Sequence, residues 1–362
     1  MLVDTLELLD YPVPKTSAAN SRHQNVPAGI DGIFMRLLGH DTNDGTGRSK
    51  RDLIARGKVM DMFVSEPICV APTGDVCGEG AVWHSSEQAL YWTDINRFLI
   101  HRFDTGDGSV KTWFFEEPVT TLVLTDRDDT LAVGLGSRVI LWEPGTDARR
   151  DLGFALPGWP AVRLNDGRAD PEGSLWLGSM RNNVRPDGSS TEAGGLDGVL
   201  YRIDPDGTVS EWKREIGISN TLAWSPDKTR FYFADTLANQ IWVYKYDGTQ
   251  KALSDEQPFF ADFSRGNPDG SAMDSAGYLW NCRYGGGCIV RVAPDGTVDR
   301  IIEMPTRNIT TCTFGGNDYR ALYITTAGAG APPGDRFAGG LFALQTDVPG
   351  LPENRFRYFG SK

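Results

Sequence analysis

The chain contains 362 residues with a formal net charge of −12, and this negative balance argues against a nucleic-acid partner or an anionic membrane surface. Glycine (42) and proline (21) are abundant, and aromatic residues stand in short runs between turn residues, which favours many short strands over long helices. The opening "MLVDTLELLDYPVPK" is acidic where a secretory signal is basic, and no stretch is apolar enough to span a bilayer. The five cysteines form no CxxC pair and indicate ordinary buried thiols, so we expect a cytoplasmic protein.

The first 65 residues differ from the rest of the chain. They are polar and rich in turn residues, as in "GHDTNDGTGRSKRD", and they lack the repeated pattern that follows. We predict an N-terminal extension over residues 1–65 that is partly irregular. It could be a tail packed along the outside of the fold, or a lid or interaction arm.

From residue 66 to 362 one pattern returns six times. Each unit has three or four short apolar strands separated by turns, as in "NTLAWSPDKTRFYFADTLANQIWVYKYDGT", and is about 40 to 55 residues long. Strand repeats of this period predict an all-β fold, a six-bladed β-propeller. The preceding segment "VMDMFVSEPICVA" is expected to add a strand to the last blade and so close the ring.

Polar residues recur where the first strand of a unit begins. In a propeller these strands line the central axis, so their N-terminal ends meet at one mouth of the channel. The residues expected there are Glu79, Arg163, Asn165, Asn220 and Asp269. Carboxylate and amide oxygens suit a hard divalent cation. Asn165 to Gly167 and Pro268 to Gly270 are also good turn sequences, in which Asn or Asp caps its own backbone, so each residue taken singly favours a structural role over a catalytic one.

Five motifs carry a family resemblance. In chain order they are "CGEGAVW", "RLNDGRADPEGSLWLGSM", "ISNTLAWSPDKTRFYFADT", "NPDGSAMDSAGYLWNCRYGGG" and "TTCTFGG". They resemble the successive motifs of the senescence marker protein (regucalcin)/gluconolactonase/luciferin-regenerating-enzyme family. The resemblance implies a six-bladed propeller that holds one divalent metal ion and hydrolyses sugar lactones. Calcium is the first candidate for this ion, with zinc or manganese as alternatives.

The resemblance also implies roles for single residues. Glu79, Asn220 and Asp269 match the metal ligands, and Asp269 is also the expected catalytic base. Arg163 and Asn165 match the substrate-contacting residues. The chain departs from the family in Ala81 and Thr221, which stand where many members have Pro and Gly. It departs again in Asn183, which stands at the position of a substrate-binding glutamate.

The expected reaction is the opening of a sugar lactone by water that the metal and Asp269 activate. The same platform could instead hydrolyse phosphotriesters, and a propeller that only binds metal without turnover is a further alternative. Nucleophilic catalysis is disfavoured because the sequence has no G-x-S-x-G motif and only four histidines. Two of them, His84 and His101, are expected beyond strand ends in solvated or capping roles.

Overall fold

A computed structural model describes residues 65–358, which form six four-stranded antiparallel sheets. The predicted extension over residues 1–65 lies outside the described residues, apart from Ser65. The strands follow one another along the chain, and each sheet uses consecutive strands except the last. The predicted six-bladed β-propeller is confirmed.

Blades 1 and 2 contain β2 (Gly78–His84), β3 (Ala89–Asp94), β4 (Leu99–Asp104), β5 (Val110–Phe114), β6 (Val119–Leu124), β7 (Leu131–Leu135), β8 (Arg138–Glu143) and β9 (Ala148–Ala155). Blades 3 and 4 contain β10 (Val162–Ala169), β11 (Leu175–Arg181), β12 (Gly198–Ile203), β13 (Val209–Ile216), β14 (Ser219–Trp224), β15 (Arg230–Asp235), β16 (Gln240–Asp247) and β17 (Ala252–Ala261). Blades 5 and 6 contain β18 (Asn267–Met273), β19 (Leu279–Tyr284), β20 (Cys288–Val292), β21 (Val298–Glu303), β22 (Ile309–Gly315), β23 (Ala321–Thr326), β24 (Leu341–Gln345) and β1 (Ile68–Ala71).

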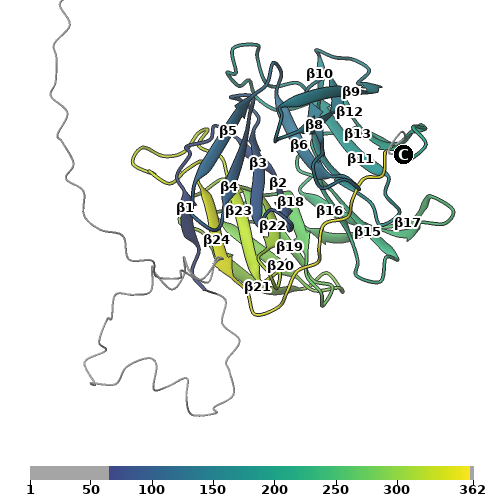
Figure 1. Ribbon diagram of the computed structural model, residues 1–362. Coiled ribbons are helices and arrows are strands. Elements are labelled where there is room, and N and C mark those ends of the chain that lie inside the picture. Colours follow the sequence, from purple (N-terminus) through teal and green to yellow (C-terminus); the bar gives the residue numbers. More distant parts are fainter. Residues whose placement is uncertain (1–64, 359–362) are drawn as a thin grey trace, which may run out of the picture.

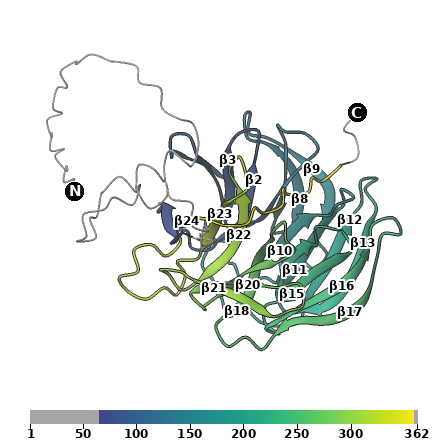
Figure 2. The same cartoon turned by 90° about the horizontal axis from the view of Figure 1, so that it is seen from below.

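The first strand of each blade faces the axis. β2 contacts β6 and β22, β10 contacts β6 and β14, and β18 contacts β14 and β22, so the six inner strands form a closed ring. Figure 2 shows β10 to β13 in order from the inside of their blade to its outer rim. The N-terminal ends of the inner strands therefore surround one mouth of the propeller.

β1 closes the ring, as the sequence predicted. It pairs antiparallel with β24, with Ile68 opposite Ala343, and becomes the outermost strand of blade 6. The Ser65 N–H extends the pairing by donating to the Gln345 carbonyl at 2.9 Å. A strand from the start of the propeller thus covers the edge that blade 6 would otherwise expose.

The hydrophobic core is divided into six clusters, one between each pair of neighbouring blades. The cluster between blades 3 and 4 is aromatic, with the ring centroids of Trp176 and Phe231 5.2 Å apart and those of Trp224 and Phe231 4.9 Å apart. Such pairs stabilise beyond their buried area, so each blade is held by both neighbours.

Every inner strand carries one β-bulge near its N-terminal end. At each bulge the pairing with the second strand shifts by one residue. The shifts lie between Glu79 and Val82, Val119 and Thr121, Leu164 and Gly167, Asn220 and Ala223, Pro268 and Ser271, and Ile309 and Cys312. Because a bulge adds a residue and changes the direction of nearby side chains, these six bulges form a ring of irregular backbone around the axis.

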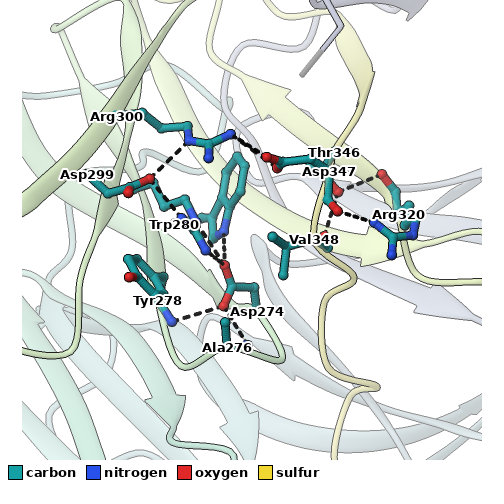
Figure 3. A network of polar contacts seen from close by, with 11 residues as sticks. Asp274, Ala276, Tyr278, Trp280, Asp299, Arg300, Arg320, Thr346, Asp347 and Val348 are labelled. Atoms are coloured by element: carbon teal, nitrogen blue, oxygen red, sulfur yellow. Dashed lines mark hydrogen bonds and ion pairs between the residues drawn. The ribbon is translucent and has the colours of Figure 1, made fainter. Parts of the chain in front are cut away.

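A polar network ties blade 5 to the C-terminal segment (residues 346–358), as Figure 3 shows. Asp274 accepts hydrogen bonds from the Trp280 indole and from the Ala276 and Tyr278 backbone, each at 3.0 Å. On the other side, the Arg300 guanidinium donates to both Asp347 carboxylate oxygens at 3.1 Å. The network fixes the point at which the chain leaves blade 6.

The C-terminal segment then crosses the mouth opposite the N-terminal ends of the inner strands. The backbone of Leu351 donates to Met273 and that of Phe356 to Leu124, both at the far ends of inner strands. Phe356 is fully buried between blades 2 and 3. Figure 1 shows the segment in yellow, running from the side of β21 to the neighbourhood of β11. One mouth of the channel is therefore covered.

Candidate functional site

The six bulges bring the predicted site residues to the uncovered mouth. Asn165 and Asp269 lie within bulges, and Glu79 and Asn220 lie directly before them. Asn165, Asn220 and Asp269 are buried, while Glu79 is partly exposed. The alternative in which Asn165 and Asp269 cap turns is wrong, because both lie inside β10 and β18.

A chain of hydrogen bonds starts at Arg163 and orients two amides. The Arg163 guanidinium donates to Asn165 Oδ1 at 2.7 Å, and Asn165 Nδ2 donates to Asn220 Oδ1 at 3.2 Å. Asn220 Nδ2 then donates to Thr236 Oγ1 at 2.8 Å. Because arginine can only donate, it sets the orientation of Asn165, which in turn sets that of Asn220. An amide oxygen accepts two hydrogen bonds, so Asn220 Oδ1 keeps one lone pair for a ligand.

Glu79 and Asp269 form a pair of carboxylates within hydrogen-bonding reach of each other. Burial and then the negative charge of Asp269 raise the pKa of Glu79 well above its ordinary value. Burial and then the charge of Asp166 likewise raise the pKa of Asp269. Two close carboxylates in a low-dielectric site repel each other, and a bound cation would relieve this repulsion.

The donor set fits a hard cation. Glu79, Asn220 and Asp269 present only oxygen ligands, and Thr236 orients the amide from behind. Among residues 65–358 no group of three or more His, Cys, Asp or Glu side chains is arranged to hold a metal ion. A cation at this mouth would be bound by the carboxylates of Glu79 and Asp269 and by the amide oxygen of Asn220, with the remaining coordination positions open to water or substrate.

Arg163 is a buried cation whose hydrogen bonds all go to uncharged oxygens in the described part of the chain. Its side chain is held by the amide oxygens of Asn165 and Asn183, with Arg163 Nη2 2.9 Å from Asn183 Oδ1. No ion pair joins it to an Asp or Glu in the part of the chain that the structure describes. Burial lowers its pKa to about 10, so it remains charged in neutral solution. This unneutralised charge is suited to negative charge on a bound molecule.

Sequence reasoning missed Asp166, a third carboxylate on the axis. It lies in the β10 bulge beside Asn165, and burial raises its pKa to about 6. Below it, Glu353 of the C-terminal segment accepts from Thr313 Oγ1 at 2.9 Å and lies 3.4 Å from Arg168 Nε. The cavity between them measures only about 10 Å³, room for about one water. The channel is thus filled beneath the site.

Thr221, one of the departures from the family, has a left-handed backbone with φ of 52°. Gly80 occupies the equivalent place in blade 1 with φ of 59°. This conformation is strained for a β-branched residue. The Thr221 hydroxyl compensates by donating to the Asp269 carbonyl and lying 2.9 Å from Ser271 Oγ, which ties blade 4 to the bulge of blade 5.

The two histidines of the propeller are not where the sequence placed them. His101 lies in the middle of β4, where its Nδ1 is 2.8 Å from Thr112 Oγ1, and it is buried. His84 is the last residue of β2 and its Nε2 is 2.8 Å from the Asp128 carbonyl. The expectation of solvated or capping roles beyond strand ends is wrong in position, because both residues lie within strands of blade 1 and are buried, and His84 contacts a backbone carbonyl of blade 2.

The structure is thus a six-bladed propeller with carboxylate and amide side chains gathered at one mouth. The family model described as SMP-30/Gluconolactonase/LRE-like region matches residues 77–328, and the chain belongs to this family. The resemblance seen in the five motifs is confirmed.

Two relatives match nearly over their whole length. Pentonolactonase XacC of Haloferax volcanii is 36% identical over 303 residues, which cover 79% of this chain and 96% of the relative. The 6-deoxy-6-sulfogluconolactonase of Pseudomonas putida is 35% identical over 301 residues, covering 80% and 97%.

A solved structure described as a calcium-binding protein, regucalcin, from Agrobacterium tumefaciens superposes with a TM-score of 0.74. It covers 82% of this chain and 98% of its own, at 24% identity, and so supports the fold alone. Within residues 65–358, no helix has the length and apolar character needed to cross a membrane. The five cysteines are free thiols, of which Cys69 and Cys77 are only partly buried.

Proposed function

We propose that this protein hydrolyses a sugar lactone to the open-chain hydroxy acid, using a divalent cation held by Glu79, Asn220 and Asp269. The observation that carries the proposal is the repelling pair of carboxylates beside the oriented Asn220 oxygen, at the mouth of the channel that residues 65–358 leave open. Relatives named for a pentonolactone and a sulfogluconolactone support a sugar lactone as the substrate class.

Calcium is the first candidate for the cation, with zinc and manganese as alternatives. An all-oxygen donor set suits calcium and manganese better than zinc, which prefers nitrogen and sulfur. Relatives named regucalcin, among them the Gallus gallus protein at 30% identity, also support calcium. When bound, the cation would polarise the lactone carbonyl.

Asp269 is the proposed base. It would take a proton from the water that attacks the carbonyl carbon, and it would return this proton to the ring oxygen as the C–O bond breaks. Its burial favours this role, because a carboxylate in a low-dielectric site accepts a proton more readily than one in water.

Arg163 is proposed to stabilise the negative charge that develops on the carbonyl oxygen. Its position is set in advance by Asn165 and Asn183, so little reorganisation is needed during the reaction. The Nδ2 group of Asn183 and the second lone pair of Asn165 Oδ1 would be offered to the sugar hydroxyls. A glutamate in place of Asn183 would neutralise Arg163, so the asparagine leaves the arginine available to the substrate.

A lactone panel tests the proposal. We expect proton release above the spontaneous rate with pentono- and gluconolactones, loss of this activity in a strong chelator, and recovery on adding a divalent cation. A phosphotriester assayed alongside tests the alternative chemistry. Full lactone turnover by exhaustively chelated protein would contradict the metal role, and turnover of the phosphotriester alone would contradict the substrate class.

A further inference from the structure

A broad hollow of about 710 Å³ lies at the open mouth, next to the candidate site. It is lined by residues of blades 5 and 6, among them Asn267, Tyr284 and Arg307. Asn267 is two residues before Asp269 on β18 and lies opposite Tyr284 on β19. Burial, and then the nearby groups Cys77, Asp269 and Glu79, raise the pKa of Tyr284 to about 12. The hollow therefore borders the N-terminal end of β18, the strand that carries Asp269.

Arg307 gives this hollow a positive charge. Its Nε lies 3.3 Å from the Gly285 carbonyl, and no carboxylate forms an ion pair with it among the described residues. The other arginine of the hollow, Arg265, is neutralised by Glu303 through two hydrogen bonds of 2.7 and 2.8 Å. Within residues 65–358, no Asp or Glu lines the hollow. One exposed guanidinium thus faces an acid-free surface in a chain whose net charge is −12.

We propose that Arg307, with the Tyr284 hydroxyl, binds an anionic group at the end of the sugar lactone distant from the reacting carbonyl. The group would be a phosphate, sulfonate or carboxylate. This inference rests on the proposed function and narrows its substrate class. The Arg307 guanidinium recognises such groups through paired N–H donors. Arg163, at the other side of the site, is enclosed by two asparagines and serves the carbonyl end of the lactone.

The test compares gluconolactone with the same lactone carrying a phosphate on C6. We expect the wild-type protein to favour the phosphorylated lactone in kcat/KM. In Arg307→Gln the ratio of the two kcat/KM values should fall roughly 5- to 30-fold, mainly through KM, since a charge-assisted hydrogen bond is lost at a partly exposed site. Arg307→Lys keeps the charge and should recover part of the ratio.

Arg214→Gln is the matched control. Arg214 lies on β13 at the rim of blade 3 and is exposed, so this variant removes one positive charge without touching the hollow. The ratio should stay at the wild-type value. An equal change in both variants, or no preference in the wild-type protein, would overturn the inference.

Binding of the products separates this inference from the proposed function. Calorimetry with gluconate and 6-phosphogluconate should show tighter binding of the phosphorylated acid, lost in Arg307→Gln. If neither lactone is hydrolysed, the proposed function fails, and these two affinities still decide whether Arg307 recognises an anion. Equal affinities in wild-type protein would refute the anion site even if lactone hydrolysis were found.

Discussion

Asp166 is a carboxyl whose charge lowers stability in neutral solution, so Asp166→Asn should stabilise the metal-free protein. Burial raises its pKa from 3.8 to about 6 in the folded state. Because the folded pKa lies above the unfolded one, the folded state binds more protons between these two pH values. The stability that protonated Asp166 contributes is therefore fully present below about pH 4 and is lost as the pH rises through about 6.

The magnitude follows from this shift. A difference of about two pKa units corresponds to about 3 kcal/mol once the pH exceeds both values. Asp166 keeps part of its surface open to the channel, so screening reduces this figure and we expect a gain of about 1–3 kcal/mol at pH 7.5. By the same relation the gain should shrink to about a third at pH 4.5. Asparagine keeps an oxygen for the Gly167 N–H, which now donates to Asp166 at 2.8 Å.

Urea unfolding in the presence of a chelator, followed by tryptophan fluorescence at both pH values, measures the gain. Asp206→Asn is the control, because Asp206 lies in an exposed turn and hydrogen bonds from Thr208 lower its pKa. This second variant should lose stability at pH 7.5 instead of gaining it. A stabilisation by Asp166→Asn that is equal at both pH values, or a loss at pH 7.5, would refute the reasoning from burial.

Three further predictions concern the base, a bulge and the covered mouth. Asp269→Asn should lower kcat by roughly 10²- to 10⁴-fold at saturating cation, because a proton acceptor is removed. Asn220→Asp should bind the cation at least as well as the wild-type protein and should lose less activity. Near-normal turnover in Asp269→Asn would show that Asp269 is a ligand only. Thr221→Gly should be about 1 kcal/mol more stable than Thr221→Ala in urea unfolding, since both lose the hydroxyl and only glycine tolerates the positive φ without strain; a more stable alanine variant would contradict the strain. Phe356→Ala should lower the free energy of unfolding by about 3–5 kcal/mol, since the ring is fully buried, and an unchanged unfolding midpoint would show that the C-terminal segment is not part of the cooperative fold.

The six units and the closing strand could be predicted because they depend on local alternation of apolar and polar residues and on turn residues. Gly207 and Gly296, which end two hairpin turns, both have the positive φ that these turns require and that glycine adopts without strain. The bulges could not be predicted, because a bulge is defined by the partner strand and leaves no sign in one strand read alone. For this reason Asn165 to Gly167 fits a turn equally well, and Asp166 was not recognised as a channel residue.

The C-terminal segment escaped prediction for a different reason. It has no repeat pattern, and its contacts join residues far apart in the chain, such as Phe356 with Leu124 and Glu353 with Thr313. Glu353 is a charged residue in an irregular stretch, which in isolation indicates solvent exposure. Only the closed ring creates the narrow axial space in which its carboxylate meets Arg168.

The two ends of the described chain act on different edges of the same ring. β1 covers the side of blade 6, and the C-terminal segment covers the mouth opposite the candidate site. With the channel below Asp166 reduced to a cavity of about 10 Å³, a sugar-sized molecule has no path along the axis. Among residues 65–358, only the mouth at the candidate site leaves a passage for a substrate and its product, and Arg163 and Arg307 lie on different blades at that mouth.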